Sequence, residues 1–202
     1  MQYLKDNVKQ KIIKSALSEF KENGYQKSSM RDIAAKADIV SGNIYRYFEN
    51  KETLFEITVG STYELMKNIE KQVQTEFAEN AINFAGCGNF KFIKDAISQS
   101  LGVFSECGTE LLVLLDKSEG TKYAGCKEDL KRAVSGTLHN VCLAEFKKIG
   151  KKIEDDFILD VMASSFIDGV CLILRNDGDS SHQIELINSW FYVVFNDFYQ
   201  RI

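Results

Sequence analysis

The chain has 202 residues, of which 45% are hydrophobic and 27% charged, a composition that supports a folded core and excludes a largely disordered chain. No apolar run approaches the roughly 20 residues of a membrane span, and the N-terminus has no apolar signal region, so we expect a cytoplasmic protein without a membrane partner. The formal net charge of -4 argues against a general nucleic-acid binder. Its distribution is uneven, however, because residues 1–54 hold 10 Lys and Arg against 7 Asp and Glu. A mildly basic N-terminal part therefore precedes an acidic remainder.

The five cysteines are widely spaced and form no C-x-x-C pair. This pattern favours free, mostly buried thiols in a reducing compartment, with metal binding or redox sensing as the alternative. The sequence contains no proline, which permits long uninterrupted helices.

The first element in chain order is a helix over residues 5–23. Its apolar residues recur at helical spacing: Val8, Ile12, Ala16, Leu17 and Phe20. Gly24 is suited to end this helix, because glycine readily adopts the left-handed conformation of a helix C-cap.

Two short helices joined by a tight turn follow. Ser29 and Asp32 are spaced as in a capping box, with Asp in place of the usual Glu or Gln, and they predict the start of the second helix. Its inward-facing residues are Ile33, Ala34 and Ala37. The turn contains Asp38, a residue type that tolerates a positive φ. The third helix places Ile44 and Phe48 one turn apart on its buried face.

Longer helices are expected in the rest of the chain. Their approximate ranges are 51–77, 90–104, 109–117, 126–149, 155–175 and 182–202, with loops at 85–89 and 176–181. Alternation with a period of two residues is not sustained anywhere. The prediction is an all-α chain of about nine helices, with a three-helix helix-turn-helix domain at residues 1–50 and a larger helical domain at residues 51–202.

The third helix and its flanks carry the residues expected to contact DNA. The start of a recognition helix meets base edges, so small or polar side chains are needed there. Gly42 lets the backbone come close to DNA, and Asn43 can donate to and accept from an adenine edge. The full set expected at bases and phosphates is Ser28, Ser29, Ser41, Gly42, Asn43, Tyr45, Arg46, Tyr47 and Lys51. The alternative is a small helical bundle in which the tyrosines only pack.

Residues 28–55, SSMRDIAAKADIVSGNIYRYFENKETLF, resemble the N-terminal domain of TetR-family transcriptional regulators. The family pattern has a Thr/Ser pair, then IA, then G-x-x-Y-x-x-F-x-x-K-x-x-L, matched here by Ser28, Ser29, Ile33, Ala34, Gly42, Tyr45, Phe48, Lys51 and Leu54. Asp38 stands where the family usually has Gly, and Val40 where it usually has a Ser or Thr that caps the recognition helix. Ser41 is available to cap this helix one residue later.

The resemblance implies a helical homodimer whose two recognition helices enter successive major grooves of a near-palindromic, double-stranded DNA operator. It also implies a C-terminal domain that binds a small-molecule inducer and dimerises. The last two helices are the expected dimer contact, because both are apolar around more of their circumference than one buried face needs. Burial within the same monomer is the alternative.

An inducer pocket should be mostly apolar with a few polar groups. The candidates are Phe92, Phe104, Tyr123, His139, Cys142, Phe146, Phe166 and Asp168. His139 and Cys142 share a helix face, but further ligands are missing, so we interpret them as core residues and expect no metal. Asp168 lies inside an apolar run, where it is suited to bind a cationic ligand, to pair with a neighbouring cation or to lie at the dimer rim.

These features predict a ligand-responsive DNA-binding repressor without a cofactor. The alternative is a constitutive DNA-organising or partner-binding protein of the same fold. An enzyme is not expected, because the sequence has only two histidines and none of the common catalytic motifs.

Overall fold

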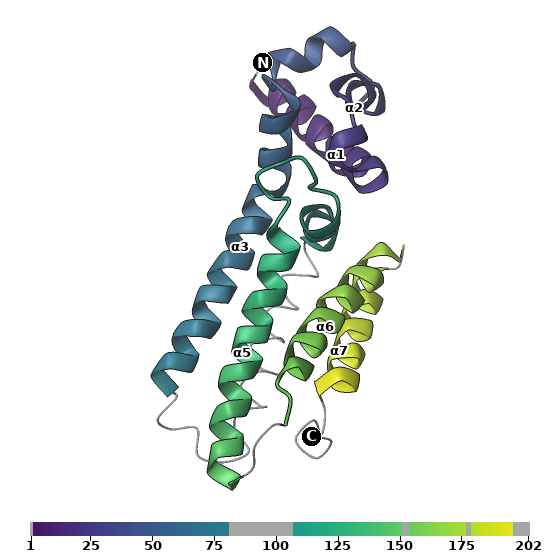
Figure 1. Ribbon diagram of the computed structural model, residues 1–202. Helices are drawn as coiled ribbons and strands as arrows, with labels where there is room; N and C mark the ends of the chain where they lie inside the picture. The colour runs from purple at the N-terminus through teal and green to yellow at the C-terminus, as the bar shows by residue number, and fades with distance from the viewer. Residues whose placement is uncertain (1, 81–106, 151–153, 177–178, 196–202) are drawn as a thin grey trace. The chain divides into compact units, whose positions relative to one another are not determined.

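The computed structural model describes residues 2–80, 107–150, 154–176 and 179–195, which are almost entirely helical (Figure 1). The helices are α1 (Gln2–Lys27), α2 (Met30–Lys36), the 3₁₀ helix η1 (Ser41–Arg46), α3 (Lys51–Asn80), α5 (Cys126–Ile149), α6 (Phe157–Arg175) and α7 (Ser180–Phe195), and residues 107–116 are helical as well. The described residues contain no strand, so the predicted all-α class is confirmed. The predicted helix at 90–104 and loop at 85–89 lie outside the described residues.

The chain forms two compact units. The head unit contains residues 2–65 and 109–126, and the body unit contains the other described residues. Consequently α3 contributes to both units, and segment 109–126 packs with N-terminal helices that are distant from it in sequence. The predicted domain boundary near residue 50 stays a prediction.

Local backbone chemistry shapes the head unit as the sequence predicts. Gly24 has a φ of 73° and interrupts the helical geometry of α1. Ser29 is the N-cap of α2, and its hydroxyl accepts a hydrogen bond from the N–H of Asp32. Asp38 has a φ of 53° in the turn after α2. The fully buried residues of these elements include Ile12, Ala16, Phe20, Ile33, Ala34, Ala37 and Ile44.

Segment 109–126 is held in the head unit by apolar packing and polar contacts. Leucine and valine side chains at 111–115 are all buried. The N–H of Tyr25 donates to the carbonyl of Lys117 at 2.9 Å, so the segment is bonded to the end of α1. The ring of Tyr123 packs edge-on against Tyr63, with centroids 5.0 Å apart.

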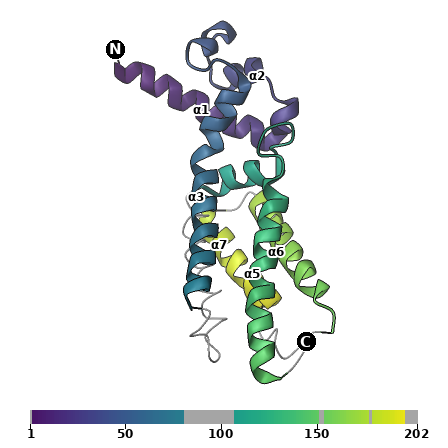
Figure 2. The same cartoon turned by 60° about the vertical axis from the view of Figure 1, so that its left-hand side comes forward.

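In the body unit, α6 and α7 lie side by side (Figure 1 and Figure 2). The rings of Phe166 and Phe195 meet edge to face, with centroids 5.1 Å apart. The indole ring of Trp190 in α7 packs against α6 at Gly169, and its N–H donates to the carbonyl of Phe166 at 3.2 Å. Gly169 is required here because the missing side chain leaves room for the indole.

Helix α6 differs from one expectation drawn from the sequence. It has 19 residues and a hydropathy of 2.0, so by length and composition alone it qualifies as a membrane span. It nevertheless contains Asp160 and Asp168, and seven of its side chains are buried in the body unit. This combination is typical of the core helix of a globular domain.

Replacing Gly169 with alanine should destabilise the body unit. A Cβ atom at Gly169 would lie 2.6 Å from Cε2 of Trp190, so the indole would have to move and lose its hydrogen bond to Phe166. We expect the free energy of unfolding, measured by urea denaturation, to fall by about 1–3 kcal/mol.

The matched control is Gly136→Ala in α5, where no atom lies within 4 Å of the Cβ position. Alanine is the better helix former, so this variant should gain about 0.5–1 kcal/mol. Equal stability of the two variants would contradict the packing described for Trp190.

Candidate nucleic-acid interface

The segment from Ser41 to Arg46 forms the exposed surface on which the sequence places most DNA contacts. Its exposed members are Ser41, Gly42, Asn43, Tyr45 and Arg46, and Tyr47 after them is half-buried. Ile44 and Phe48 are buried and anchor the segment to the head unit. With these two side chains buried, the exposed residues of η1 remain accessible to a partner.

The turn before η1 is defined by backbone hydrogen bonds. The N–H of Asp38 donates to the carbonyl of Ala35 at 3.0 Å, and the N–H of Asn43 donates to that of Val40 at 2.8 Å. Val40 is the N-cap of η1, and its side chain makes no capping hydrogen bond. Ser41 is the first residue of η1, so the expectation that it caps the helix one residue later is wrong.

Ser28 is buried, with 4% of its surface exposed. Its hydroxyl oxygen lies 2.6 Å from the carbonyl of Gly24 and 3.4 Å from that of Glu19. A hydroxyl that donates inward is not available to a phosphate, so Ser28 does not fit its expected role. Ser29 is half-buried, and its main contacts are with Asp32 at the start of α2.

Lys51 ties the start of α3 to the end of α1 instead of pointing at a partner. Its Nζ lies 2.6 Å from the carbonyl of Tyr25, 2.9 Å from that of Ser28 and 3.5 Å from that of Gln26. It also lies 4.2 Å from the centroid of the Tyr25 ring. Burial lowers the pKa of this ammonium group. An ammonium has three N–H groups, so these contacts make Lys51 a clamp on backbone carbonyls, and its phosphate contact stays a prediction.

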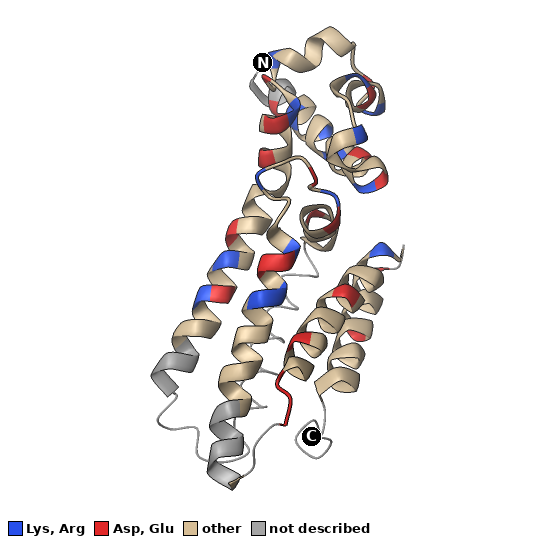
Figure 3. Cartoon of the chain, viewed as in Figure 1, with Lys and Arg blue, Asp and Glu red and all other residues tan. Residues whose placement is uncertain are grey.

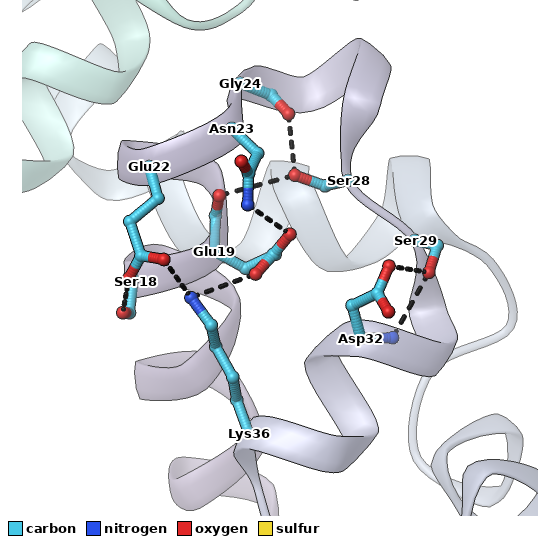
Figure 4. A network of polar contacts seen from close by, with 9 residues as sticks. All are labelled: Ser18, Glu19, Glu22, Asn23, Gly24, Ser28, Ser29, Asp32 and Lys36. Atoms are coloured by element: carbon cyan, nitrogen blue, oxygen red, sulfur yellow. Dashed lines mark hydrogen bonds and ion pairs between the residues drawn. The ribbon is translucent and has the colours of Figure 1, made fainter.

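An ion pair between the buried Glu19 of α1 and the exposed Lys36 of α2 holds the two helices together (Figure 4). Glu19 is 3% exposed, and its carboxylate accepts hydrogen bonds from Lys36 at 2.9 Å and from Asn23 at 2.8 Å. Lys36 also donates to Glu22 at 2.6 Å. Burial lowers the pKa of Lys36, but its hydrogen bonds to Glu22 and Glu19 outweigh burial and raise it. Sequence reasoning missed this network, although Glu19 falls three residues after Ala16 on the apolar stripe of α1.

The exposed charge of the head unit is mixed. Basic and acidic residues are interspersed along α1 and α2 (Figure 3). Lys11 lies 3.6 Å from Asp38, and Lys36 and Lys51 serve the internal contacts described above. Arg31 of α2 is exposed, as is Arg46 of η1. Arg31 is not among the predicted DNA contacts, most of which lie on the third helix.

The pocket candidates are divided between the two units. Tyr123 is buried in the head unit, whereas His139, Cys142, Phe166 and Asp168 belong to the body unit. Phe92 and Phe104 lie outside the described residues. Phe146 lies in α5, but its side chain is outside the described part of the structure.

Asp168 pairs with two lysines of α5, which is the second of the roles open to it from the sequence. Its carboxylate lies 2.8 Å from Lys127 and 3.0 Å from Lys131. Partial burial raises the pKa of Asp168, but hydrogen bonds from the two lysines outweigh burial and leave it below its ordinary value. A carboxylate with two cationic partners has little need of a cationic ligand.

His139 also has partners within the body unit. Its Nδ1 lies 3.0 Å from the carbonyl of Ser135, and its Nε2 lies 3.8 Å from the carboxylate of Asp156. The hydroxyl of Ser135 donates to Asp160 of α6. Among the described residues, no group of three or more His, Cys, Asp and Glu side chains is placed to hold a metal ion.

Comparison with known proteins gives a consistent family for the N-terminal region. Residues 12–57 match the family model described as "Bacterial regulatory proteins, tetR family". The biofilm operon icaADBC HTH-type negative transcriptional regulator IcaR of Staphylococcus aureus (strain Newman) is 32% identical over 62 residues. These residues are 31% of this chain and 33% of that one, so the match spans a third of the relative's length.

Two solved structures share the fold over nearly the whole chain. Regulatory protein TetR from Rhodobacter sphaeroides has a TM-score of 0.53 and 14% identity, covering 92% of this chain and 95% of the other. The transcriptional regulator FadR from Bacillus subtilis, in complex with stearoyl-CoA, has a TM-score of 0.52 and 18% identity, covering 93% and 97%. At these identities the shared property is the fold.

Lys51→Met should destabilise the head unit, because it removes the ammonium group that satisfies carbonyls at the end of α1 while keeping a long apolar stem. We expect a loss of about 1–3 kcal/mol in the free energy of unfolding, measured by urea denaturation. Arg46→Ala is the control, since Arg46 is exposed on η1, and it should change stability by less than about 0.5 kcal/mol. An unchanged unfolding midpoint for Lys51→Met would rule out an energetic role for the clamp.

Proposed function

We propose that this chain is a member of the TetR family of bacterial regulatory proteins and acts as a homodimeric DNA-binding repressor that a small-molecule inducer releases from a near-palindromic operator. The observation that carries the proposal is the exposed segment Ser41–Arg46, anchored by two buried side chains within the residues that match the family model. We assign DNA binding to residues 1–50 and inducer binding and dimerisation to residues 51–202. We place the protein in the cytoplasm, where its DNA partner is found.

The proposed DNA contacts are the exposed and half-buried members of the predicted set, apart from the half-buried Lys51, whose ammonium group contacts backbone carbonyls. These are Ser29, Ser41, Gly42, Asn43, Tyr45, Arg46 and Tyr47. No atom lies within 4 Å of the Cβ position of Gly42, so a DNA surface can come close to the backbone there. The amide of Asn43 suits an adenine edge, and the guanidinium of Arg46 suits a guanine edge or a phosphate.

Dimerisation is supported by apolar side chains that a single chain leaves exposed on two adjacent helices. They are Phe157, Ile158, Val161 and Leu172 of α6 and Tyr192 and Val193 of α7. Isolated exposed apolar residues are common, but six on two packed helices are apolar surface that a second copy would cover. A dimer would also supply the two recognition segments that a near-palindromic operator needs.

The response to an inducer is proposed to pass through segment 109–126 as well as through α3. Within the head unit, Lys122 pairs with Glu56 at 2.6 Å, and Tyr25 is bonded to Lys117. The segment continues directly into α5, so a change in α5 would act on these contacts. A ligand changes DNA affinity only if it binds two states differently. Because the similar FadR binds stearoyl-CoA, an acyl-CoA is the first ligand to test.

Footprinting and gel shift on the DNA that flanks the protein's own gene test the proposal directly. We expect a protected near-palindrome, with affinity that falls steeply as salt rises. Arg46→Ala should weaken binding by about tenfold or more, because it removes a base or phosphate contact from each subunit.

The matched control for Arg46→Ala is Arg132→Ala, which removes the same charge from an exposed position on α5 and should leave affinity nearly unchanged. A chain that protects no sequence there and selects none from random DNA would contradict the proposed function.

The double variant Leu172→Glu, Val193→Glu should be monomeric, because it places two carboxylates in each half of the proposed interface. Sedimentation at micromolar concentration would measure the mass, and operator binding should be lost with the dimer. Ile57→Glu introduces a carboxylate at an exposed apolar position of the head unit and should leave the dimer intact. A double variant that remained dimeric would place the interface elsewhere.

A further inference from the structure

Val40 is exposed to an unusual degree for an apolar side chain. At 72% it has the largest exposed fraction among the large hydrophobic side chains of the described residues. It lies in the turn between α2 and η1, in an extended conformation with φ -63° and ψ 131°. Its carbonyl accepts the N–H of Asn43, so the backbone that carries the side chain is held in place.

Valine is a poor choice at this position for the folded chain alone. Ser, Thr, Asp or Asn would cap η1 through a side-chain oxygen, whereas Val40 makes no such hydrogen bond. Its isopropyl group also remains in water, which is unfavourable for an apolar surface. The two disadvantages suggest that the side chain meets a partner.

The surroundings of Val40 would let a partner come close. Ser41, Gly42 and Asn43 are exposed and carry small side chains or none. Ile44 is fully buried, so the aliphatic side chain of η1 does not contribute to this surface. Val40 is therefore followed along the chain by three exposed residues with small or polar side chains, and Tyr45 is the exposed aromatic residue of η1.

DNA offers such a surface a single apolar feature. Base edges in the major groove present hydrogen-bond donors and acceptors, apart from the C5 methyl group of thymine. Resting on the proposed function, we infer that Val40 contacts the C5 methyl of a thymine in each operator half-site and so contributes to sequence specificity.

The test removes only that methyl group. The full chain first selects its operator from a random double-stranded DNA library. At each thymine position of the half-site in turn, the thymines of both half-sites are then replaced by deoxyuridine. At the thymine that Val40 contacts, the replacement should weaken wild-type binding about fourfold per half-site, the value expected for one buried carbon group. The same replacement should not affect the variant Val40→Ser, while replacements elsewhere should affect both proteins equally.

Two further measurements separate this contact from an effect on folding. Val40→Ser supplies a capping hydroxyl, so its unfolding midpoint should equal or exceed that of the wild type. Val40→Thr retains one methyl group, and it should keep the dependence on the thymine methyl.

The inference is overturned if deoxyuridine affects the wild type and Val40→Ser equally at every position, or if the selected half-sites lack thymine. Either result would leave the proposed function standing, because an operator would have been selected. A chain that selects no sequence would overturn the proposed function and this inference with it.

Discussion

The carboxylate of Glu19 is removed from water in the head unit, and it is tolerated there because Lys36 and Asn23 donate hydrogen bonds to it. Only Glu19 is buried, since Lys36 is exposed, and a buried carboxylate left without a partner is strongly unfavourable. Any arrangement that separates α1 from the end of α2 is therefore disfavoured. Lys36 is the last residue of α2, and the turn to η1 follows at once, so this pair fixes the point from which segment Ser41–Arg46 starts.

The features that the sequence predicts well are those determined by a residue's own chemistry. Gly24 and Asp38 adopt positive φ because their residue types tolerate it, and Ser29 caps α2 because its hydroxyl reaches a nearby N–H. Lys51 and Ser28 show the opposite case. Their partners are backbone carbonyls, and for Lys51 these lie more than 20 residues away along the chain. Nothing in a local pattern distinguishes a lysine that binds carbonyls from one that binds phosphates.

The body unit shows a similar division between what periodicity reveals and what it does not. Apolar spacing predicts α5 and α6 closely. It does not reveal which helix each face meets, so the pairing of Asp168 with Lys127 and Lys131 was only one of several roles left open. Tyr123 is a predicted pocket residue because it is aromatic and central in the sequence, but the ring of Tyr63, which it contacts, belongs to the head unit.

The position of Trp190 gives the chain a built-in spectroscopic probe. It is the single tryptophan of the sequence, and its indole packs on Gly169 and bonds to Phe166 within the body unit. Fluorescence excited where tyrosine does not absorb therefore reports the contact between α6 and α7. Circular dichroism reports all helices together. Followed in the same denaturation, the two signals would coincide if the units unfold as one and separate if they do not.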